Sequence, residues 1–285
     1  MRNVFVGSEA VAQGMLNEYE LRRWHRRIFR DVYVPKGHDV SLRDRIAGAW
    51  LRSDRRGVIA GVAASALHGA SWIDDDITIE LLWSNSRPPR GLIARDERFA
   101  DDEITRIAGI PVTTRARTAF DLGRHLPRDD AIARLDALMW SSPFSLEDVW
   151  LLAKRYRGAR GLPQLREALP LVDGGAASPM ETWLRVLVVD AGLPRPTTQI
   201  PVVENHGRVV RWLDMGWEDF KVAAEYDGDQ HRTDRKQYVK DIRVMPKLER
   251  MGWKVIRVIK EDHAEDVVER IRTALVSRGW KPPIL

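Results

Sequence analysis

The sequence predicts a chain of mixed helices and strands, of the α+β or α/β class. Three observations indicate this. Two short helices and a strand fill residues 1–40, and a Gly-rich stretch, Pro170–Pro179, is typical of a domain linker. A complete set of helix, hairpin, crossover, strand and helix follows over 177–285. We therefore expect three domains, with residues 41–170 forming an α/β middle domain that ends in helices.

Composition restricts the class of protein. The chain has 285 residues, of which 44% are hydrophobic, so it can bury globular cores. It contains no cysteine, which excludes disulfides, cysteine-based zinc sites and cysteine nucleophiles. The longest small-apolar stretch, Val58–Trp72, is too short and too polar to span a membrane. Because no secretory signal is visible in the N-terminal residues, we expect a soluble, cytoplasmic protein without a membrane partner.

Positive charge is concentrated near the N-terminus. The net charge is +5, but the segment from Glu20 to Arg56 alone holds 11 Lys or Arg against 5 acids, a local excess of +6. Clustered arginine in a basic segment is typical of a polyanion-binding protein. We therefore expect DNA as a partner.

The first 40 residues predict a winged helix. Ser8–Asn17 and Glu18–Arg27 have the patterns of two short helices, the second with Leu21 and Trp24 facing inward, and Ile28–Val34 alternates as a strand. A helical pair with an arginine-rich second helix and a β-wing is a pattern that reads DNA. The alternative is an amphipathic helix with a solvated basic face. The candidate DNA contacts are Arg22, Arg23, Arg26, Arg27 and Lys36.

The middle segment shows helix caps but no chemistry. Ser41 and Thr114 are each placed to cap a helix, and His68, beside Gly69, is expected to be a packed or capping histidine. The segment shows neither metal-ligand spacing nor a nucleophile elbow. The expected helices are Ser41–Ser53, Val58–His68, Arg128–Trp140 and Ser145–Arg157, and the expected strands are Ile77–Trp83, Leu92–Arg95 and Glu103–Ile107.

The last third predicts a mixed sheet with helices alongside. Two β-branched runs, Arg208–Trp217 and Phe220–Tyr226, form an antiparallel hairpin, and the mostly helical segment Asp234–Met251 then crosses over to a parallel strand. Pro246 is expected to break or kink that crossover helix. The remaining elements are a helix from Ser178 to Ala191, strands Ile200–Val203 and Trp253–Ile259, and a helix Asp262–Arg278.

Acidic side chains gather on this hairpin. If Trp217 pairs with Phe220, then Asp214 lies opposite Ala223 with Glu225 as its diagonal neighbour on the same face. Asp227 follows on the same side of the strand. Because no basic partner is at hand, such acids need protonation, solvent or a divalent cation, and hard oxygen ligands suit Mg²⁺ or Mn²⁺.

The order of these elements resembles the PD-(D/E)XK restriction-endonuclease-like superfamily, in particular the branch similar to very-short-patch-repair endonucleases. The resemblance lies in a helix with Glu181, a strand ending at Leu213-Asp214, a strand with AEYDG at 224–228, His231 and GWKVIRV at 252–258. It covers about the last 110 residues. Through RDVYVP at 30–35, SALHG at 65–69 and GIPVTTRARTAFDL at 109–122, the front of the chain resembles the abortive-infection antitoxin family of actinobacterial type.

The superfamily resemblance implies roles for individual residues. Asp214 and Glu225 would bind the metal, with Glu181 contributing from the first helix. Asp227 stands where the motif usually has lysine, so the usual positive group is missing there. His231 would then transfer the proton, and Lys221 is a poorer substitute. The catalytic set is thus Asp214, Glu225, Asp227, His231 and Glu181.

Structural alternatives remain for these residues. Glu181 stands three after Ser178, as in a capping box, and Asp227-Gly228-Asp229 has turn chemistry. Asp214 and Glu225 could form a solvated rim.

Two function classes therefore stay open. One is a Mg²⁺- or Mn²⁺-dependent DNA endonuclease, which would act as a homodimer or by successive nicks. The other is a non-catalytic DNA-binding antitoxin or repressor that keeps the nuclease fold. The second resemblance implies a cognate toxin as its partner.

Overall fold

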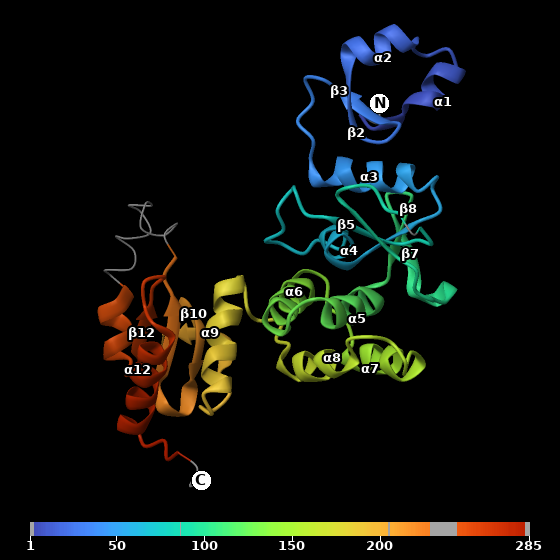
Figure 1. The fold of residues 1–285 in the computed structure, drawn as a ribbon. Coiled ribbons are helices and arrows are strands. Elements are labelled where there is room, and N and C mark those ends of the chain that lie inside the picture. Colours follow the sequence, from blue (N-terminus) through green and yellow to red (C-terminus); the bar gives the residue numbers. More distant parts are fainter. Residues whose placement is uncertain (1–2, 86, 205, 229–243, 283–285) are drawn as a thin grey trace. The chain divides into compact units, whose positions relative to one another are not determined.

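A computed structural model describes residues 3–85, 87–204, 206–228 and 244–282. The chain forms two compact units, Met1–Pro170 and Leu171–Leu285, each of which is considered by itself (Figure 1). Both units mix helices with sheets, as the sequence predicted, and two of the three sheets described contain parallel and antiparallel pairs. In the described part of the chain, no helix has the length and apolar character needed to cross a membrane.

The first unit begins with a small three-stranded antiparallel sheet in the order β1-β3-β2. Its chain order places two helices between the first and second strands. The last two strands form a hairpin, which we call the wing, because Asp31, with a φ of 62°, turns the chain between them. The elements are β1 (Phe5–Val6), α1 (Gly7–Ala12), α2 (Glu18–Trp24), β2 (His25–Phe29), β3 (Val32–Pro35) and α3 (Leu42–Arg52).

Three expectations for this segment were wrong. The second helix ends at Trp24, so Arg26 and Arg27 lie on β2 instead of the helix. The single strand expected over Ile28–Val34 is divided by the turn into β2 and β3. The side chain of Trp24 is 58% exposed, although Leu21 is buried as expected. A seven-residue helix presents only one narrow inward stripe, which Leu21 fills.

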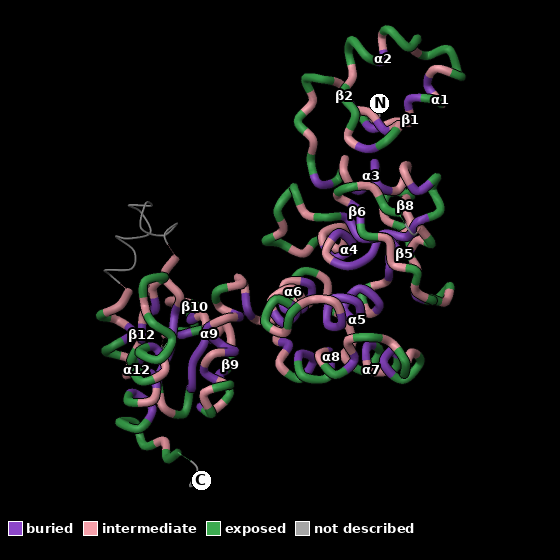
Figure 2. Tube along the Cα trace, viewed as in Figure 1, coloured by how far each residue is buried: buried purple, intermediate pink, exposed green. Residues whose placement is uncertain are grey.

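A five-stranded sheet in the order β6-β5-β4-β8-β7 forms the centre of the first unit. One hydrophobic core joins this sheet to α3 and to the wing, through buried residues such as Val32, Ile46 and Ile59 (Figure 2). Residues on both sides of the expected boundary at 40/41 therefore pack into the same core. The elements are β4 (Val58–Ala60), α4 (Gly61–Leu67), β5 (Ile79–Leu82), β6 (Leu92–Arg95), β7 (Ile104–Ile107) and β8 (Ile110–Thr113).

Four helices complete the first unit: α5 (Arg115–His125), α6 (Arg128–Ser141), α7 (Leu146–Arg155) and α8 (Leu162–Ala168). Ser41 and Thr114 cap α3 and α5 as expected, since their hydroxyls accept from the backbone amides of Asp44 and Arg117. His68 is also structural, as expected. It ends α4 and donates from Nε2 to the carbonyl oxygen of Thr113 at 2.8 Å.

The second unit is a four-stranded sheet in the order β12-β11-β10-β9. Strands β9, β10 and β11 are antiparallel neighbours, and β12 returns parallel to β11, as the crossover predicted. The elements are α9 (Pro179–Asp190), β9 (Thr197–Val203), β10 (Val209–Trp217), β11 (Val222–Tyr226), β12 (Lys254–Val258) and α12 (Ala264–Ser277).

Two hydrophobic clusters line this sheet. In one, α9 and α12 contribute residues such as Leu184 and Ile271 against Met215 and Ala224 of the sheet. In the other, Leu213 and Ala223 pack with Leu248 of the helical residues 244–250. Pro246 lies within these helical residues, so the chain is helical immediately before and after the proline.

Candidate functional site

The acidic hairpin forms with a register different from the one expected. Trp217 pairs with Val222, because Glu218–Phe220 closes the turn as a 3-10 helix and Lys221 adopts a left-handed conformation with a φ of 51°. The register thus moves by two residues, and a two-residue shift keeps every side chain on its face. Met215 now pairs with Ala224, so Asp214 and Glu225 are the next residues along the ladder on their two strands.

Asp214 lies within electrostatic reach of two other carboxylates. Burial, the largest cause, together with the charges of Glu181 and Glu225 raises the pKa of Asp214 to about 7. A hydrogen bond from the backbone amide of Tyr226 to Asp214 Oδ2, 3.0 Å long, acts in the opposite direction. The structure therefore places Glu181 of α9 and Glu225 of β11 within electrostatic range of Asp214 on β10. Clustered acids that hold a proton near neutral pH are typical of functional sites.

A basic partner stands beside these acids, contrary to expectation. Arg211, three residues before Asp214 on β10, donates from Nε to Glu225 Oε1 at 2.7 Å and from Nη2 to Oε2 at 2.9 Å. Glu225 is only 4% exposed, and the side chain of Arg211 is 20% exposed. The sequence did not reveal this pair because Arg211 and Glu225 meet only through the pairing of the two strands.

Glu181 has a structural role as well. Its Oε1 accepts from Ser178 Oγ at 2.9 Å, and its Oε2 accepts from the amide of Ala177 at 2.9 Å. Gln199 Nε2 donates to the same Oε2 at 3.3 Å. These bonds fix the carboxylate at the start of α9, where Pro179 takes the first helical position. The helix start therefore orients Glu181 beside Asp214.

The other expected catalytic residues are placed differently. Asp227 follows β11 and pairs with Arg257 of β12 at 3.6 Å. Lys221 lies at the far end of β11, where its Nζ is 4.8 Å from the centre of the Trp253 ring, so it is no substitute for the motif lysine. His231 lies outside the residues that the structure describes.

The donor set of Glu181, Asp214 and Glu225 fits a hard divalent cation by its chemistry. All three offer carboxylate oxygens, and the mutual repulsion that raises the pKa of Asp214 is what a cation relieves. The fit has one condition. Both oxygens of Glu225 already accept from Arg211, so the guanidinium has to leave before this carboxylate can serve as a ligand.

A second acidic group lies in the first unit, where the sequence suggested no chemistry. The ligand atoms of Glu97, Asp121 and His125 all lie within 4.8 Å of one another, so these residues could hold a metal ion. Asp121 and His125 are four residues apart on α5, a spacing that places both on one helix face and that could have revealed the group.

Arginines already neutralise this group. Arg124 donates from Nη2 to Glu97 Oε2 at 2.5 Å and to Asp121 Oδ1 at 3.0 Å, and Arg117 binds Asp121 through Nε. Both arginines are buried. A cation entering here would meet two fixed guanidinium groups, which makes this cluster better suited to holding the domain together than to binding metal.

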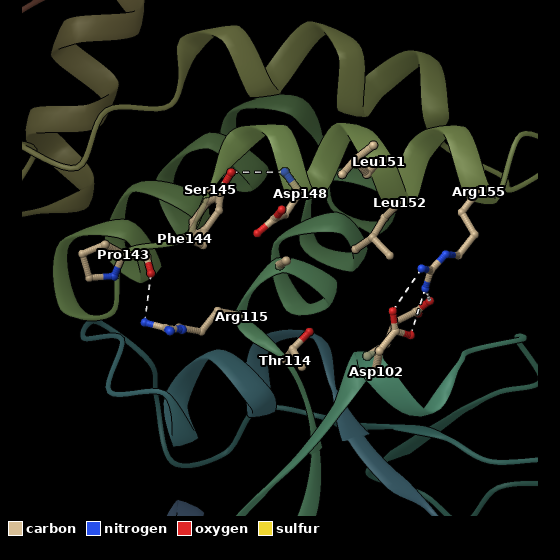
Figure 3. Close-up of a pocket in the computed structure, with 12 residues that line it drawn as sticks. Asp102, Thr114, Arg115, Pro143, Phe144, Ser145, Asp148, Leu151, Leu152 and Arg155 are labelled. Carbon is tan, nitrogen blue, oxygen red and sulfur yellow. Dashed lines mark hydrogen bonds and ion pairs between the residues drawn. The ribbon is translucent and has the colours of Figure 1, made fainter.

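A cavity of about 420 Å³ opens between α5 and α7 (Figure 3). Arg115 reaches across one end of it to the carbonyl oxygen of Pro143 at 3.0 Å. At the other end Arg155 pairs with Asp102 at 3.0 Å. Asp102 thus neutralises Arg155 at that end, and none of the expected catalytic residues lines the cavity.

The candidate DNA contacts all lie on exposed positions of α2, β2 and the end of the wing. Arg23 packs between two aromatic rings, 5.7 Å from the ring centre of Tyr19 and 5.1 Å from that of Trp24, and both rings are exposed. Arg22 pairs with Glu18 of its own helix, and Arg26 donates to the carbonyl oxygen of His38. The residues concerned are Arg22, Arg23, Arg26, Arg27 and Lys36.

Two curated proteins are similar to this chain. The uncharacterized protein MT2308 of Mycobacterium tuberculosis strain CDC 1551 is 30% identical to it over 238 residues, or 83% of this chain and 86% of the relative. The uncharacterized protein Rv2248 of strain H37Rv matches to the same extent. Because neither unit is 238 residues long, the similarity extends into both. No protein-family model matches the chain.

Proposed function

We propose that this chain, which belongs to the family of those two Mycobacterium tuberculosis proteins, is a divalent-metal-dependent DNA endonuclease. The observation that carries the proposal is the meeting of Glu181, Asp214 and Glu225 at one place in the second unit, where the pKa of Asp214 is raised to about 7. The resemblance to the PD-(D/E)XK superfamily assigns metal binding to the same three residues.

Each of these residues has a distinct task. Asp214 and Glu225 would hold Mg²⁺ or Mn²⁺, and Glu181, fixed by its three hydrogen bonds, would complete the donor set. When bound, the ion neutralises charge on the phosphodiester and lowers the pKa of a water molecule. His231 is the candidate for moving the proton, since an imidazole titrates near neutral pH.

The N-terminal segment is proposed to hold the duplex. Its chain order, two helices followed by a β-wing, supports a winged helix, and α2 presents arginines beside exposed aromatic rings. Phosphate contacts from arginine fix position and orientation without reading sequence. The basic excess of the N-terminal segment thus supplies affinity, and the second unit supplies the chemistry.

One observation favours the second candidate function, a non-catalytic antitoxin or repressor that binds DNA. Asp227 replaces the motif lysine and Arg211 already neutralises Glu225, an arrangement that would stabilise a scaffold without any cation. The resemblance of the front of the chain to the abortive-infection antitoxin family supports this reading, with a cognate toxin as partner.

The experiment that separates the two functions is a cleavage assay with Mg²⁺ or Mn²⁺. Purified protein is incubated with supercoiled plasmid and with duplex, mismatched and forked oligonucleotides. The endonuclease proposal predicts nicking or cutting that Asp214→Ala abolishes while the variant still binds duplex DNA. DNA binding with no cleavage of any substrate in either metal would leave the regulator as the function.

A further inference from the structure

The guanidinium of Arg211 and a divalent cation compete for the same two oxygens. The fork of Nε and Nη2 takes Oε1 and Oε2 of Glu225 at 2.7 and 2.9 Å. A bidentate pair of this kind is among the strongest side-chain interactions, and burial strengthens it further. Glu225 is 4% exposed, so its charge needs bonded partners to offset the hydration that it loses.

We propose that Arg211 is a latch: it holds Glu225 in place of the cation, and a divalent metal ion binds only by displacing it. This inference rests on the proposed function, because it takes Glu225 as a metal ligand. Two positive groups cannot share one buried carboxylate without strong repulsion, so binding of the ion requires the guanidinium to move away. The side chain of Arg211 is 20% exposed, which gives it a route to solvent.

As a latch, Arg211 has a positioning role. This role differs from a purely structural one in the direction in which removal of Arg211 changes the affinity for metal. If Arg211 only supported the fold, its removal would loosen the site and weaken metal binding. If Arg211 occupies the cation's ligand, its removal exposes a carboxylate that then binds the ion more tightly. Metal affinity therefore distinguishes the two roles without any measurement of DNA cleavage.

Arg257 provides a matched control in the same sheet. Its Nη1 lies 3.6 Å from Asp227 Oδ2, and its side chain is 38% exposed. Its loss removes the same charge from the position beside Glu225 in the β11–β12 ladder, while the two bonds from Arg211 to Glu225 stay in place. An effect of net charge alone would therefore appear in both variants, whereas the latch predicts an effect of Arg211 alone.

The test is a calorimetric titration of the full chain with Mn²⁺ at pH 8 in the absence of DNA. We expect Arg211→Ala to bind Mn²⁺ at least about tenfold more tightly than wild type, a gain of about 1.4 kcal/mol. Arg257→Ala should stay within about twofold of wild type, since exposed pairs contribute little. The double variant Arg211→Ala/Asp214→Asn should lose the gain, which places the ion at this site.

A thermal melt tests whether Arg211→Ala has a folding defect. Because Arg211→Ala removes two hydrogen bonds to the buried Glu225, its melting temperature should fall in metal-free buffer and rise with Mn²⁺ by more than that of wild type. Unchanged or weaker Mn²⁺ binding by Arg211→Ala, an equal gain in Arg257→Ala, or no Mn²⁺ binding by either protein would overturn the latch. A clear gain with no DNA cleavage would uphold the latch and refute the endonuclease. Cleavage by wild type without any gain in Arg211→Ala would refute the latch alone.

Discussion

Arg211 of β10 and Glu225 of β11 form a two-point ion pair beneath the surface of the second unit, with bonds of 2.7 and 2.9 Å. In the neighbouring pair, Arg257 Nη1 lies 3.6 Å from Asp227 Oδ2, and both side chains are more exposed. Two ion pairs of the same chemistry on one sheet thus differ in burial and geometry. The stability of the hairpin should depend on the first and hardly on the second.

We expect Glu225→Ala to lower the free energy of unfolding by about 2–4 kcal/mol, because it removes both bonds between this carboxylate and the partly buried guanidinium of Arg211. Asp227→Ala, the control, should cost less than about 1 kcal/mol, as exposed pairs do. Urea unfolding at pH 7 measures both. Equal losses in the two variants would show that burial does not increase the contribution of the Arg211–Glu225 pair to the free energy of unfolding.

The raised pKa of Asp214 predicts that neutralising it stabilises the protein at high pH. The pKa of Asp214 is about 7 in the folded chain and 3.8 ordinarily. The stability that its protonation gives to the fold is therefore complete below about pH 4 and is lost as pH rises through 7. Asp214→Asn keeps an oxygen to accept from Tyr226 but carries no charge. We expect it to gain about 2–4 kcal/mol over wild type at pH 8 in metal-free buffer.

The same variant should show a far smaller gain at pH 4, where Asp214 is protonated in the folded chain and about half ionised in the unfolded one. The control is Asp219→Asn, on the exposed turn of the same hairpin, which should give no such difference between the two pH values. A gain at pH 8 no larger than that at pH 4 would contradict the close approach of the three carboxylates.

The buried charges of the first unit predict the opposite pH dependence. Burial alone would raise the pKa of Glu97, but its hydrogen bond with His125 and the charge of Arg124 outweigh this and lower it to about 2. The resulting stability is present above the ordinary value of 4.5 and is lost as pH falls toward 2.

Glu97→Gln should therefore be less stable than wild type at pH 7 by about 1–3 kcal/mol, with the difference shrinking below pH 4. Thermal or urea unfolding across pH 2.5–8 follows this difference, and Glu167→Gln on the exposed side of α8 serves as the control. A difference that does not change with pH would mean that Glu97 acts by its shape and not by its charge.

Charge reversal in the N-terminal segment tests the DNA surface. Arg22→Glu/Arg26→Glu should weaken duplex binding and flatten its dependence on salt, because fewer counterions are released when fewer phosphates are contacted. The matched control is Arg166→Glu/Arg278→Glu, which reverses two exposed arginines outside the segment. Fluorescence anisotropy with a labelled duplex at several salt concentrations gives both quantities. An unchanged salt slope would indicate that α2 is an amphipathic helix whose basic face is solvated.

Local patterns predicted most elements of the fold, and the failures have physical causes. The hairpin was found from its β-branched runs, but its register depends on the left-handed backbone of Lys221, a conformation that a lysine rarely adopts. The error was two residues, which preserved the faces and hence the nearness of Asp214 and Glu225. In the first unit, the end of α2 was misplaced because arginine favours helices while β2 is set by pairing with β3.

Long-range ion pairs could not be predicted from these local patterns. Arg211 meets Glu225 across two strands, and Arg124 meets Glu97 from an element 27 residues away. Such pairs depend on tertiary packing, whereas sequence patterns report only local periodicity. The position of the acids could thus be predicted, but the arginine that neutralises one of them could not.

The most direct measurement of the central claim is a crystal structure of the protein soaked in Mn²⁺, with anomalous differences collected at the manganese edge. We predict a peak bound by Asp214 and Glu225, with Arg211 moved away from the Glu225 carboxylate. A peak at Glu97, Asp121 and His125 alone, or Glu225 still held by Arg211 with no manganese beside it, would contradict the proposed site.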